Sequence, residues 1–313
     1  MNNPTPSCYK KTSIGGQAVI EGIMMRGPVK SAMANRLPDG TLDLEEWETY
    51  PHGIAWYNRT PLIRGCFNFV ETLVTGFRCL MTSAEKAGFE EEEPSAFEQK
   101  LAKLTGQKTE TIVSTVALVL GVALAVLLFM VLPATASKLL APFLPSTMAL
   151  TLVEGGIKIA IFLVYIALVS QMKDIRRVFE YHGAEHKTIA CYEHGEELTV
   201  ENIRKYTRFH PRCGTSFLLI VLIISILVSS VVTWNSLVIR VLLKLLMLPI
   251  VVSISYEIIK LAGRYDNPVT RIVSAPGLWL QRLTTREPDD GQIEAAIAAM
   301  TPVIPDDPNA DRY

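Results

Sequence analysis

Four long apolar segments dominate the hydrophobic pattern of this chain, at residues 111–132, 147–170, 217–234 and 237–259. The first and third contain no charged side chain, and the 22 residues of the first, at about 1.5 Å of helix rise each, are enough to cross a hydrocarbon core of about 30 Å. The second and fourth are long enough as well, although each carries a few charged residues. The pattern predicts a mainly α membrane protein with about four transmembrane helices.

The basic residues near the ends of these segments gather on one side of the predicted membrane. That side holds Lys100, Lys103, Lys108, Lys173, Arg176, Arg177, Lys187, Arg204, Lys205, Arg208, Arg212, Lys260, Arg264 and Arg271, whereas the other side holds Lys138 and Arg240. By the positive-inside rule, both termini and the connection 172–216 are predicted to be cytoplasmic. Only residues 235–236 separate the last two segments, so these should form an antiparallel hairpin.

The residues before the first apolar segment predict a small cytoplasmic α+β N-terminal unit. Residues 31–48 are typical of a β-hairpin, since Pro38, Asp39 and Gly40 are turn formers between two strand-like stretches. Residues 61–89 have apolar side chains at helical spacing and predict an amphipathic helix, either packed on the β unit or lying on the bilayer. Residues 90–93 are four glutamates, followed by Pro94 and Ser95, and indicate a solvated acidic link.

We therefore expect six regions along the chain. These are a cytoplasmic β-containing unit (1–60), an amphipathic helix with an acidic linker (61–110), transmembrane helices 1–2 (111–170), a cytoplasmic His-rich loop (171–216), transmembrane helices 3–4 (217–259) and a cytoplasmic C-terminal region (260–313). In the last region, Ala275-Pro276-Gly277 predicts a break, and residues 290–300 predict a helix.

Composition supports the membrane and excludes one class of partner. The mean hydropathy of +0.27 and the hydrophobic fraction of 49% are high for a soluble protein. A net charge of −1 gives no concentrated basic surface, so nucleic acid is excluded as a partner and the lipid bilayer is expected. Five scattered cysteines without a Cys-x-x-Cys pair indicate reduced thiols, and the N-terminus lacks a secretory apolar run.

Four of the five histidines fall within 29 residues of the predicted cytoplasmic loop. His182, Glu185 and His186 form the pattern His-x-x-Glu-His of inverted zinc metallopeptidases. Residues four apart share one face of a helix, so both imidazoles can reach one ion, zinc or another divalent metal, with Glu185 beside it as the catalytic base. His210 and Cys213 are the candidates for a third metal ligand. A hydrogen-bonded network without metal is the alternative.

Two other groups of charged residues have a functional and a structural interpretation. Glu154 and Lys158 lie inside the second apolar segment, where they indicate either a transport path or a buried pair, with each other or with Arg240 and Lys244. Glu21 and Arg26 lie in a glycine-framed stretch and could face the histidine loop as an acid, a further ligand or an anion clamp, or form an ordinary ion pair.

Four stretches resemble the DUF1385 family: GGQAVIEGIMMRGP, YHGAEHK, HPRCGTSF and APGLWLQRLTTREPDD. The family is described as bacterial membrane proteins of unknown function that are labelled predicted metal-dependent enzymes. The resemblance implies roles for Gln17, Glu21 and Arg26, for His182, Glu185 and His186, and for His210, Arg212 and Cys213. It supplies no substrate.

Two hypotheses follow. The first is a zinc-dependent hydrolase at the cytoplasmic membrane face, acting on an unknown peptide or lipid-linked substrate. The second is a non-enzymatic membrane scaffold or assembly factor that binds a protein partner and whose His/Cys loop is structural. A transporter is a third alternative, resting on Glu154 and Lys158 alone.

Overall fold

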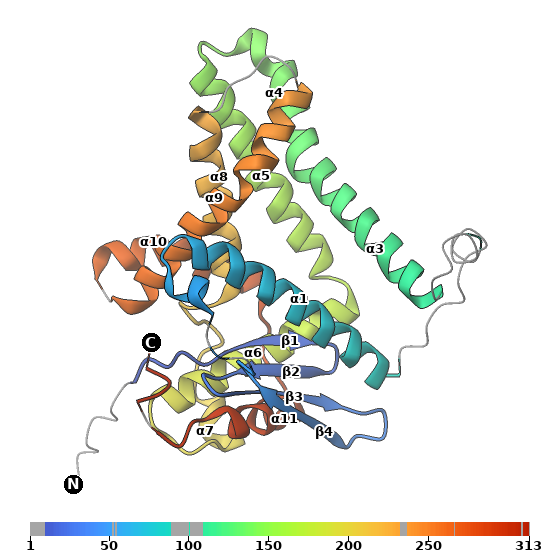
Figure 1. Ribbon diagram of the computed structural model, residues 1–313, viewed down its shortest axis with the longest axis vertical. Helices are drawn as coiled ribbons and strands as arrows, with labels where there is room; N and C mark the ends of the chain where they lie inside the picture. The colour runs from blue at the N-terminus through green and yellow to red at the C-terminus, as the bar shows by residue number, and fades with distance from the viewer. Residues whose placement is uncertain are drawn as a thin grey trace. The chain divides into compact units, whose positions relative to one another are not determined.

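The chain folds into two compact units in the computed structural model, which describes residues 10–51, 53, 55–88, 100, 109–231, 237–265, 267–307 and 309–312 (Figure 1). Unit 1 comprises Met1–Phe89, Ile166–Ile224 and Pro249–Tyr313, and unit 2 comprises Glu90–Tyr165 and Ser225–Leu248. Three separate stretches of sequence therefore build unit 1. The predicted acidic link and the predicted hairpin connection 235–236 lie outside the described residues.

Unit 1 contains an antiparallel sheet in the order β1 (Gly15–Val19), β2 (Gly22–Arg26), β3 (Lys30–Arg36) and β4 (Leu42–Glu48). The predicted hairpin is confirmed as β3 and β4, with Gly40 at a φ of 87° in the turn. The first two strands were not predicted, because their glycine- and methionine-rich sequences are poor in β-branched residues. Glu21 occupies the turn between them with a φ of 48°.

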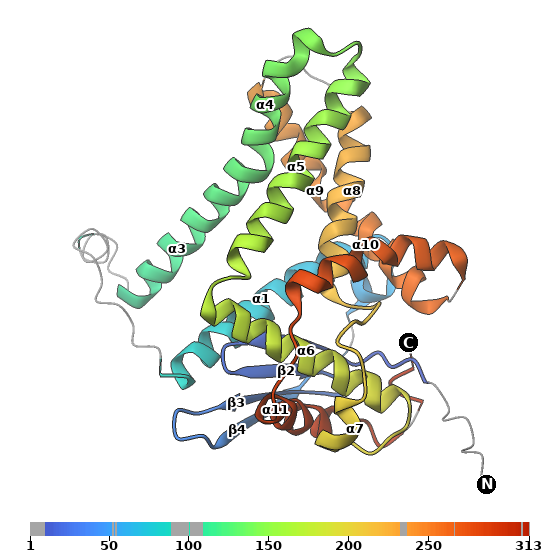
Figure 2. The same cartoon turned by 180° about the vertical axis from the view of Figure 1, so that it is seen from behind.

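Helices cover both faces of this sheet. On one face α6 (Lys173–Glu193) and α11 (Asp290–Met300) pack against β1, β2 and β3, as Figure 2 shows. The core of this layer includes Ile23, Tyr181 and Ile293. On the other face lies α1 (Ile63–Lys86), whose Cys79 packs with Val19, Met24 and Met33. The predicted amphipathic helix and the predicted helix 290–300 are both confirmed.

Short elements connect the larger ones. They are η1 (Trp56–Arg59), α7 (Val200–Arg204) and η4 (Thr301–Val303) in unit 1, and η2 (Leu127–Val131, a π-helical turn), α4 (Leu132–Leu140) and η3 (Ala141–Phe143) in unit 2. Unit 2 begins with α3 (Thr109–Val126). Three further helices, α5 (Thr147–Val169), α8 (Gly214–Val231) and α9 (Leu237–Arg264), have residues in both units.

Three helices of the described chain are long and apolar enough to cross a membrane, at Thr115–Phe143, Met148–Val169 and Val241–Arg264. The third predicted segment also forms an apolar helix, Gly214–Ser230, which is shorter. Within the described residues, all four predicted apolar segments are thus helical. Three of them have the full length of a span, which is consistent with a membrane protein.

A buried ion pair joins two of these helices within unit 2. The Lys244 ammonium of α9 donates to the Glu154 carboxylate of α5, and both side chains are less than one tenth exposed. Lys158 is buried as well. For Glu154 the structural interpretation, a pair with the fourth segment, agrees with this geometry.

The predicted break at Ala275-Pro276-Gly277 is wrong, because helix α10 (Pro268–Thr284) runs through it. Asn267 caps the helix in a capping box with Thr270, and Pro268 occupies the first turn, where its missing N–H costs nothing. Gly277 is required by packing, since a Cβ there would meet the side chain of Ser216 at the start of α8. Tertiary contact with α8 therefore outweighs the local Pro-Gly signal.

Candidate metal centre

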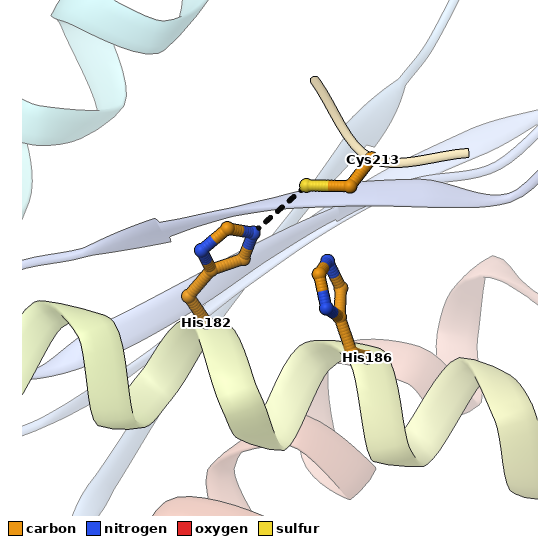
Figure 3. Close-up of side chains that lie close together, drawn as sticks. All are labelled: His182, His186 and Cys213. Atoms are coloured by element: carbon orange, nitrogen blue, oxygen red, sulfur yellow. Dashed lines mark hydrogen bonds between the residues drawn. The ribbon is translucent and has the colours of Figure 1, made fainter. Parts of the chain in front are cut away.

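Three ligand-type side chains of unit 1 meet at one point, and we call them the His–Cys cluster: His182, His186 and Cys213 (Figure 3). The two histidines lie four residues apart on α6, so their rings project from the same side, with centroids 4.4 Å apart. Cys213 immediately precedes α8. One ligand atom from each residue lies within 4.8 Å of the other two. The structure thus brings together three of the four predicted metal ligands.

Backbone carbonyls fix the orientation of both imidazole rings. His182 Nδ1 lies 2.8 Å from the carbonyl oxygen of Thr284, and His186 Nδ1 lies 2.6 Å from that of Arg208. A carbonyl only accepts, so Nδ1 carries the proton in each ring and Nε2 is the atom directed toward the cluster. Metal-binding histidines are held in the same way.

The Nε2 atoms of His182 and His186 differ in their hydrogen-bond partners. His182 Nε2 lies 3.1 Å from the Cys213 sulfur. His186 Nε2 is buried and has no hydrogen-bond partner among the described residues. A buried polar atom without a partner costs about 1–3 kcal/mol, so its presence calls for a ligand that completes it. A cation between the three ligand atoms would do so.

Cys213 lies in surroundings that favour its thiolate. Burial opposes the charged form, but the His182 and His186 rings outweigh it and hold the pKa of the Cys213 thiol well below its ordinary value. The Thr215 backbone N–H also points at the sulfur, 3.4 Å away, in the first turn of α8. Burial likewise opposes a charged His182, yet the sulfur raises the pKa of that ring to about 9. A cation bound here would compete with protons for the thiolate and the imidazole.

Glu185 lies beside the cluster on the same helix and is 5% exposed. Burial raises the pKa of its carboxyl above the ordinary value, against the opposing effect of the two histidines. Its Oε2 atom is buried and unpartnered among the described residues. Gly16 of β1 makes room for it, since a Cβ at Gly16 would lie 3.0 Å from the Glu185 carboxyl carbon.

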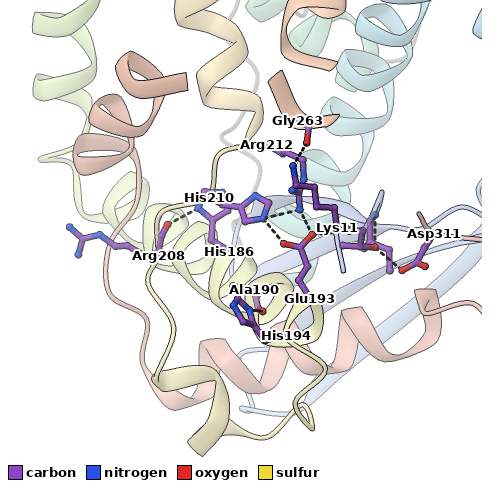
Figure 4. A network of polar contacts seen from close by, with 12 residues as sticks. Lys11, His186, Ala190, Glu193, His194, Arg208, His210, Arg212, Gly263 and Asp311 are labelled. Carbon is purple, nitrogen blue, oxygen red and sulfur yellow. Dashed lines mark hydrogen bonds and ion pairs between the residues drawn. The ribbon is translucent and has the colours of Figure 1, made fainter. Parts of the chain in front are cut away.

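His210 belongs to a second group of buried residues, the Glu193 network: Thr12, Glu193, His210, Arg212 and Gln281. Figure 4 shows Glu193, His210 and Arg212 of this group side by side. The His210 backbone donates to Gln281 Oε1 at 2.8 Å and accepts from Gln281 Nε2 at 2.7 Å. Its Nε2 faces Glu193 Oε2 at 3.4 Å, while Arg212 forms an ion pair with the same carboxylate. The structure does not bring His210 or Arg212 into the His–Cys cluster.

The predicted candidates of the N-terminal stretch have partners elsewhere. Glu21 accepts from Arg177 and from the Tyr181 hydroxyl, the latter at 3.2 Å. Arg26 pairs with Glu71 at 2.6 Å. The Gln17 amide donates to the Gly76 carbonyl of α1 at 3.4 Å. These contacts hold the sheet to α6 and α1. Glu21 and Arg26 each form an ion pair, but with Arg177 and Glu71 and not with each other.

Several positions that shape the site were not predicted. Besides Gly16, they include the carbonyls of Thr284 and Arg208, which orient the rings, and Gly183, where a Cβ would overlap the Arg286 carbonyl oxygen. Gly183 lies inside the His-x-x-Glu-His pattern, so its small size is a signal that the sequence contains. The backbone carbonyls of Thr284 and Arg208 could not be predicted, because every residue has a carbonyl and the sequence does not show which one faces a ring.

Four cysteines lie among the described residues. Among the described residues Cys66, Cys79, Cys191 and Cys213 are free thiols. Cys191 is buried, and its sulfur faces the carbonyls of Glu196 and Glu197, away from the ligand atoms of the cluster. Cys213 is thus the one free cysteine of this set that lies with the histidines.

Comparison with known proteins identifies the family. The family model described as "Protein of unknown function (DUF1385)" matches residues 60–306. The "Uncharacterized protein YqhQ" of Bacillus subtilis (strain 168) is 34% identical over 292 residues, which cover 93% of this chain and 92% of that protein. No solved structure matches the chain. The resemblance found in the sequence is confirmed, and the chain belongs to the DUF1385 family.

Proposed function

We propose that the His–Cys cluster binds a divalent metal ion, and that zinc is the metal it suits best. The unpartnered, buried Nε2 of His186 is the observation that carries this proposal. Two imidazoles and a thiolate are typical zinc ligands, and the carbonyl partners at Nδ1 leave Nε2 as the coordinating atom of each ring. The donor set and its orientation both fit the metal.

We further propose a zinc-dependent hydrolase. Three protein ligands leave one position open, as in catalytic zinc sites, where the metal supplies Lewis acidity and makes a water molecule a nucleophile near neutral pH. Glu185 is the general base. Its carboxylate lies beside the cluster, and its raised pKa brings it closer to the pH at which a base both accepts and releases a proton efficiently.

The proposed substrate is either a peptide or a lipid-linked molecule. The pocket of about 560 Å³ that Gly16 helps to line contains none of His182, Glu185, His186 and Cys213 among its lining residues, so its charge does not decide between them.

Membrane integration belongs to the same proposal. We take the four apolar helices as spans, with both termini and the segment that carries the His–Cys cluster on the cytoplasmic side. The long apolar helices and the one-sided distribution of basic residues support this arrangement. The site would then lie at the cytoplasmic end of the third span, since Cys213 precedes α8 directly.

Burial of the site supports a second candidate, a scaffold with a structural metal. Glu185 and Cys213 are 5% and 7% exposed, which is little for atoms that must meet a substrate. In a structural site a fourth protein ligand would close the coordination sphere. Substitution by Co²⁺ separates the two candidates, since added azide changes the visible spectrum of an open site and leaves a closed one unchanged.

Metal content tests the proposal. Full-length protein purified in detergent should contain about one zinc per chain by plasma mass spectrometry, and the His186→Ala and Cys213→Ala variants should lose it. His194→Ala is the matched control, because this histidine lies at the end of α6 with its Nδ1 on the Ala190 carbonyl. Circular dichroism shows that each variant is folded. Wild-type protein that takes up no divalent metal, or a control that loses it equally, overturns the proposal.

A further inference from the structure

Helix α1 faces outward with its large apolar side chains. Eight of them are between 36% and 65% exposed: Ile63, Phe67, Val70, Leu73, Val74, Phe77, Leu80 and Met81. The buried side of the helix consists instead of Gly65, Gly76, Cys79 and Ser83. A helix that packs through small residues and exposes its large apolar ones is the reverse of an ordinary surface helix.

Helix α10 repeats the arrangement in a second part of unit 1. Val269, Ile272 and Trp279 are 68%, 72% and 51% exposed. The opposite side, with Gly277, Leu280 and Gln281, is buried against the start of α8 and the His210 backbone. Unit 1 therefore presents two exposed apolar helix faces.

The α1 face continues onto the apolar helices α8 and α9. Gly65 lets α1 approach α9 so closely that a Cβ there would lie 2.8 Å from the Ser253 Cα. Next to this contact, Arg64 of α1 pairs with Glu257 of α9 at 2.5 Å. The Phe69 ring also lies 5.7 Å from that of Phe217 on α8. Beyond these contacts α9 exposes Ile250 and Leu261, so the apolar surface runs from α1 onto a helix long enough to span a membrane.

The edges of the apolar faces carry the residues expected at a membrane surface. Trp56 and Tyr265 are 68% and 52% exposed, and Trp279 lies within the α10 face itself. Arg78, Arg264, Arg271 and Arg282 are exposed on the same elements. Amphipathic aromatic rings and cationic side chains are enriched at the headgroup level, where they meet phosphates and anionic lipids.

We infer that α1 and α10 form a collar that lies in one leaflet of the bilayer, with their apolar faces among the upper acyl chains. Such helices reach about 5–10 Å into the boundary between headgroups and chains. The inference does not depend on metal binding. The collar and the His–Cys cluster nevertheless share helix α10. This helix carries Trp279, and its last residue, Thr284, provides the carbonyl that orients His182.

Tryptophan fluorescence in brominated lipid tests the collar. The full chain, with its other three tryptophans changed to phenylalanine, keeps Trp279 as a probe of α10. A second protein with all four native tryptophans replaced carries Phe77→Trp as a probe of α1. A third carries Tyr206→Trp as the control, because Tyr206 follows α7 and packs on His194 at a ring distance of 4.9 Å. Each is reconstituted into phosphatidylcholine–phosphatidylglycerol vesicles brominated near the headgroup or near the chain end.

Both collar probes should lose most of their emission to bromine near the headgroup and less to bromine at the chain end, while the control is unchanged. Quenching by aqueous acrylamide in place of bromine would place the faces in water and overturn the inference. Protection from both quenchers would place a second copy or another protein on them, and overturns it as well. Metal content, measured on the same samples, reports separately on the proposed function.

Discussion

Two polar clusters of unit 1 come from the same pieces of chain and differ in how fully they are paired. The His–Cys cluster and the Glu193 network both join α6 to residues 208–213. In the network, burial raises the pKa of Glu193, but hydrogen bonding to His210 and the charge of Arg212 outweigh it and lower the pKa below its ordinary value. Beside the cluster, burial of Glu185 prevails over the histidines, and the pKa is raised.

The difference separates architecture from a candidate site. In the Glu193 network, the charged and amide groups of three separate segments meet partners, as the Thr12 N–H to Glu193 distance of 2.8 Å illustrates. Around the cluster, His186 Nε2 and Glu185 Oε2 stay unpartnered among the described residues. A paired buried network specifies the fold, whereas oriented atoms without partners are the basis on which the cluster is proposed as a metal site.

The largest expected effect comes from breaking the network. Glu193→Leu removes the carboxylate that pairs with the Arg212 guanidinium, which is 6% exposed. Loss of one partner of a buried pair costs about 3–5 kcal/mol, so the free energy of unfolding in denaturant should fall by that amount. Under the proposed function, the folded variant should still take up zinc, because the network lies outside the His–Cys cluster.

The double variant Glu193→Leu/Arg212→Met is the control for this prediction, because removing both charges should recover part of the loss. A single variant as stable as the parent, or one that loses its metal while still folded, would erase the distinction between network and cluster.

A smaller effect is expected where the two regions share backbone. Gly183→Ala places a Cβ against the Arg286 carbonyl and must displace the segment that follows Thr284. Overpacking should cost about 1–3 kcal/mol, and metal affinity should fall too because the Thr284 carbonyl orients His182. Calorimetric zinc titration measures the affinity. Gly214→Ala is the matched control, since its Cβ would meet nothing within 4 Å, and equal losses in both variants would contradict the prediction.

The smallest effect concerns pH in metal-free protein. A carboxyl with a raised folded pKa contributes stability that is complete below its unfolded pKa and is lost as pH rises through the folded one. Glu185→Gln should therefore be more stable than the parent at neutral pH, by about 1 kcal/mol, with the difference vanishing in acid.

Glu193 should show the opposite dependence. Its lowered pKa means that its contribution is present above the unfolded pKa and is lost as pH falls through the folded value. Denaturant unfolding of Glu185→Gln and Glu193→Gln with chelator, across acidic to neutral pH, measures both. If the free energy of unfolding, relative to the parent, changed with pH in the same direction in both variants, the contrast between Glu185 and Glu193 would be wrong.

Local spacing predicted the part of the site that one helix supplies. The His182–His186 repeat depends only on helical geometry, and Cys213 follows in the same loop. The separation of His210 from Cys213 was beyond local reasoning, because Gln281, 71 residues further along, holds the His210 backbone. Likewise, the fold around Pro276 depends on the contact of Gly277 with Ser216.

The amphipathic helix α1 shows the same division between local and long-range information. Its periodicity predicted a helix with one apolar face, and the structure confirms the helix. Which side packs inward depended on Gly65 and Gly76, whose missing side chains let Ser253 and Gln17 approach. Periodicity alone left both orientations open, with the apolar side packed on the β unit or lying on the bilayer, so the outward orientation became visible only in three dimensions.

The interleaved sequence of unit 1 has a consequence for biosynthesis. The Thr12 hydroxyl donates to Asp311, 299 residues later, and α11 supplies part of the layer that covers β2 and β3. At about 5–20 residues per second, a ribosome needs roughly 15–60 seconds to make that stretch. The strands are synthesised first, and one face of the sheet stays uncovered until α11 has been made. Protection of this face by a chaperone or by the translocation machinery should therefore govern the yield of correctly folded protein.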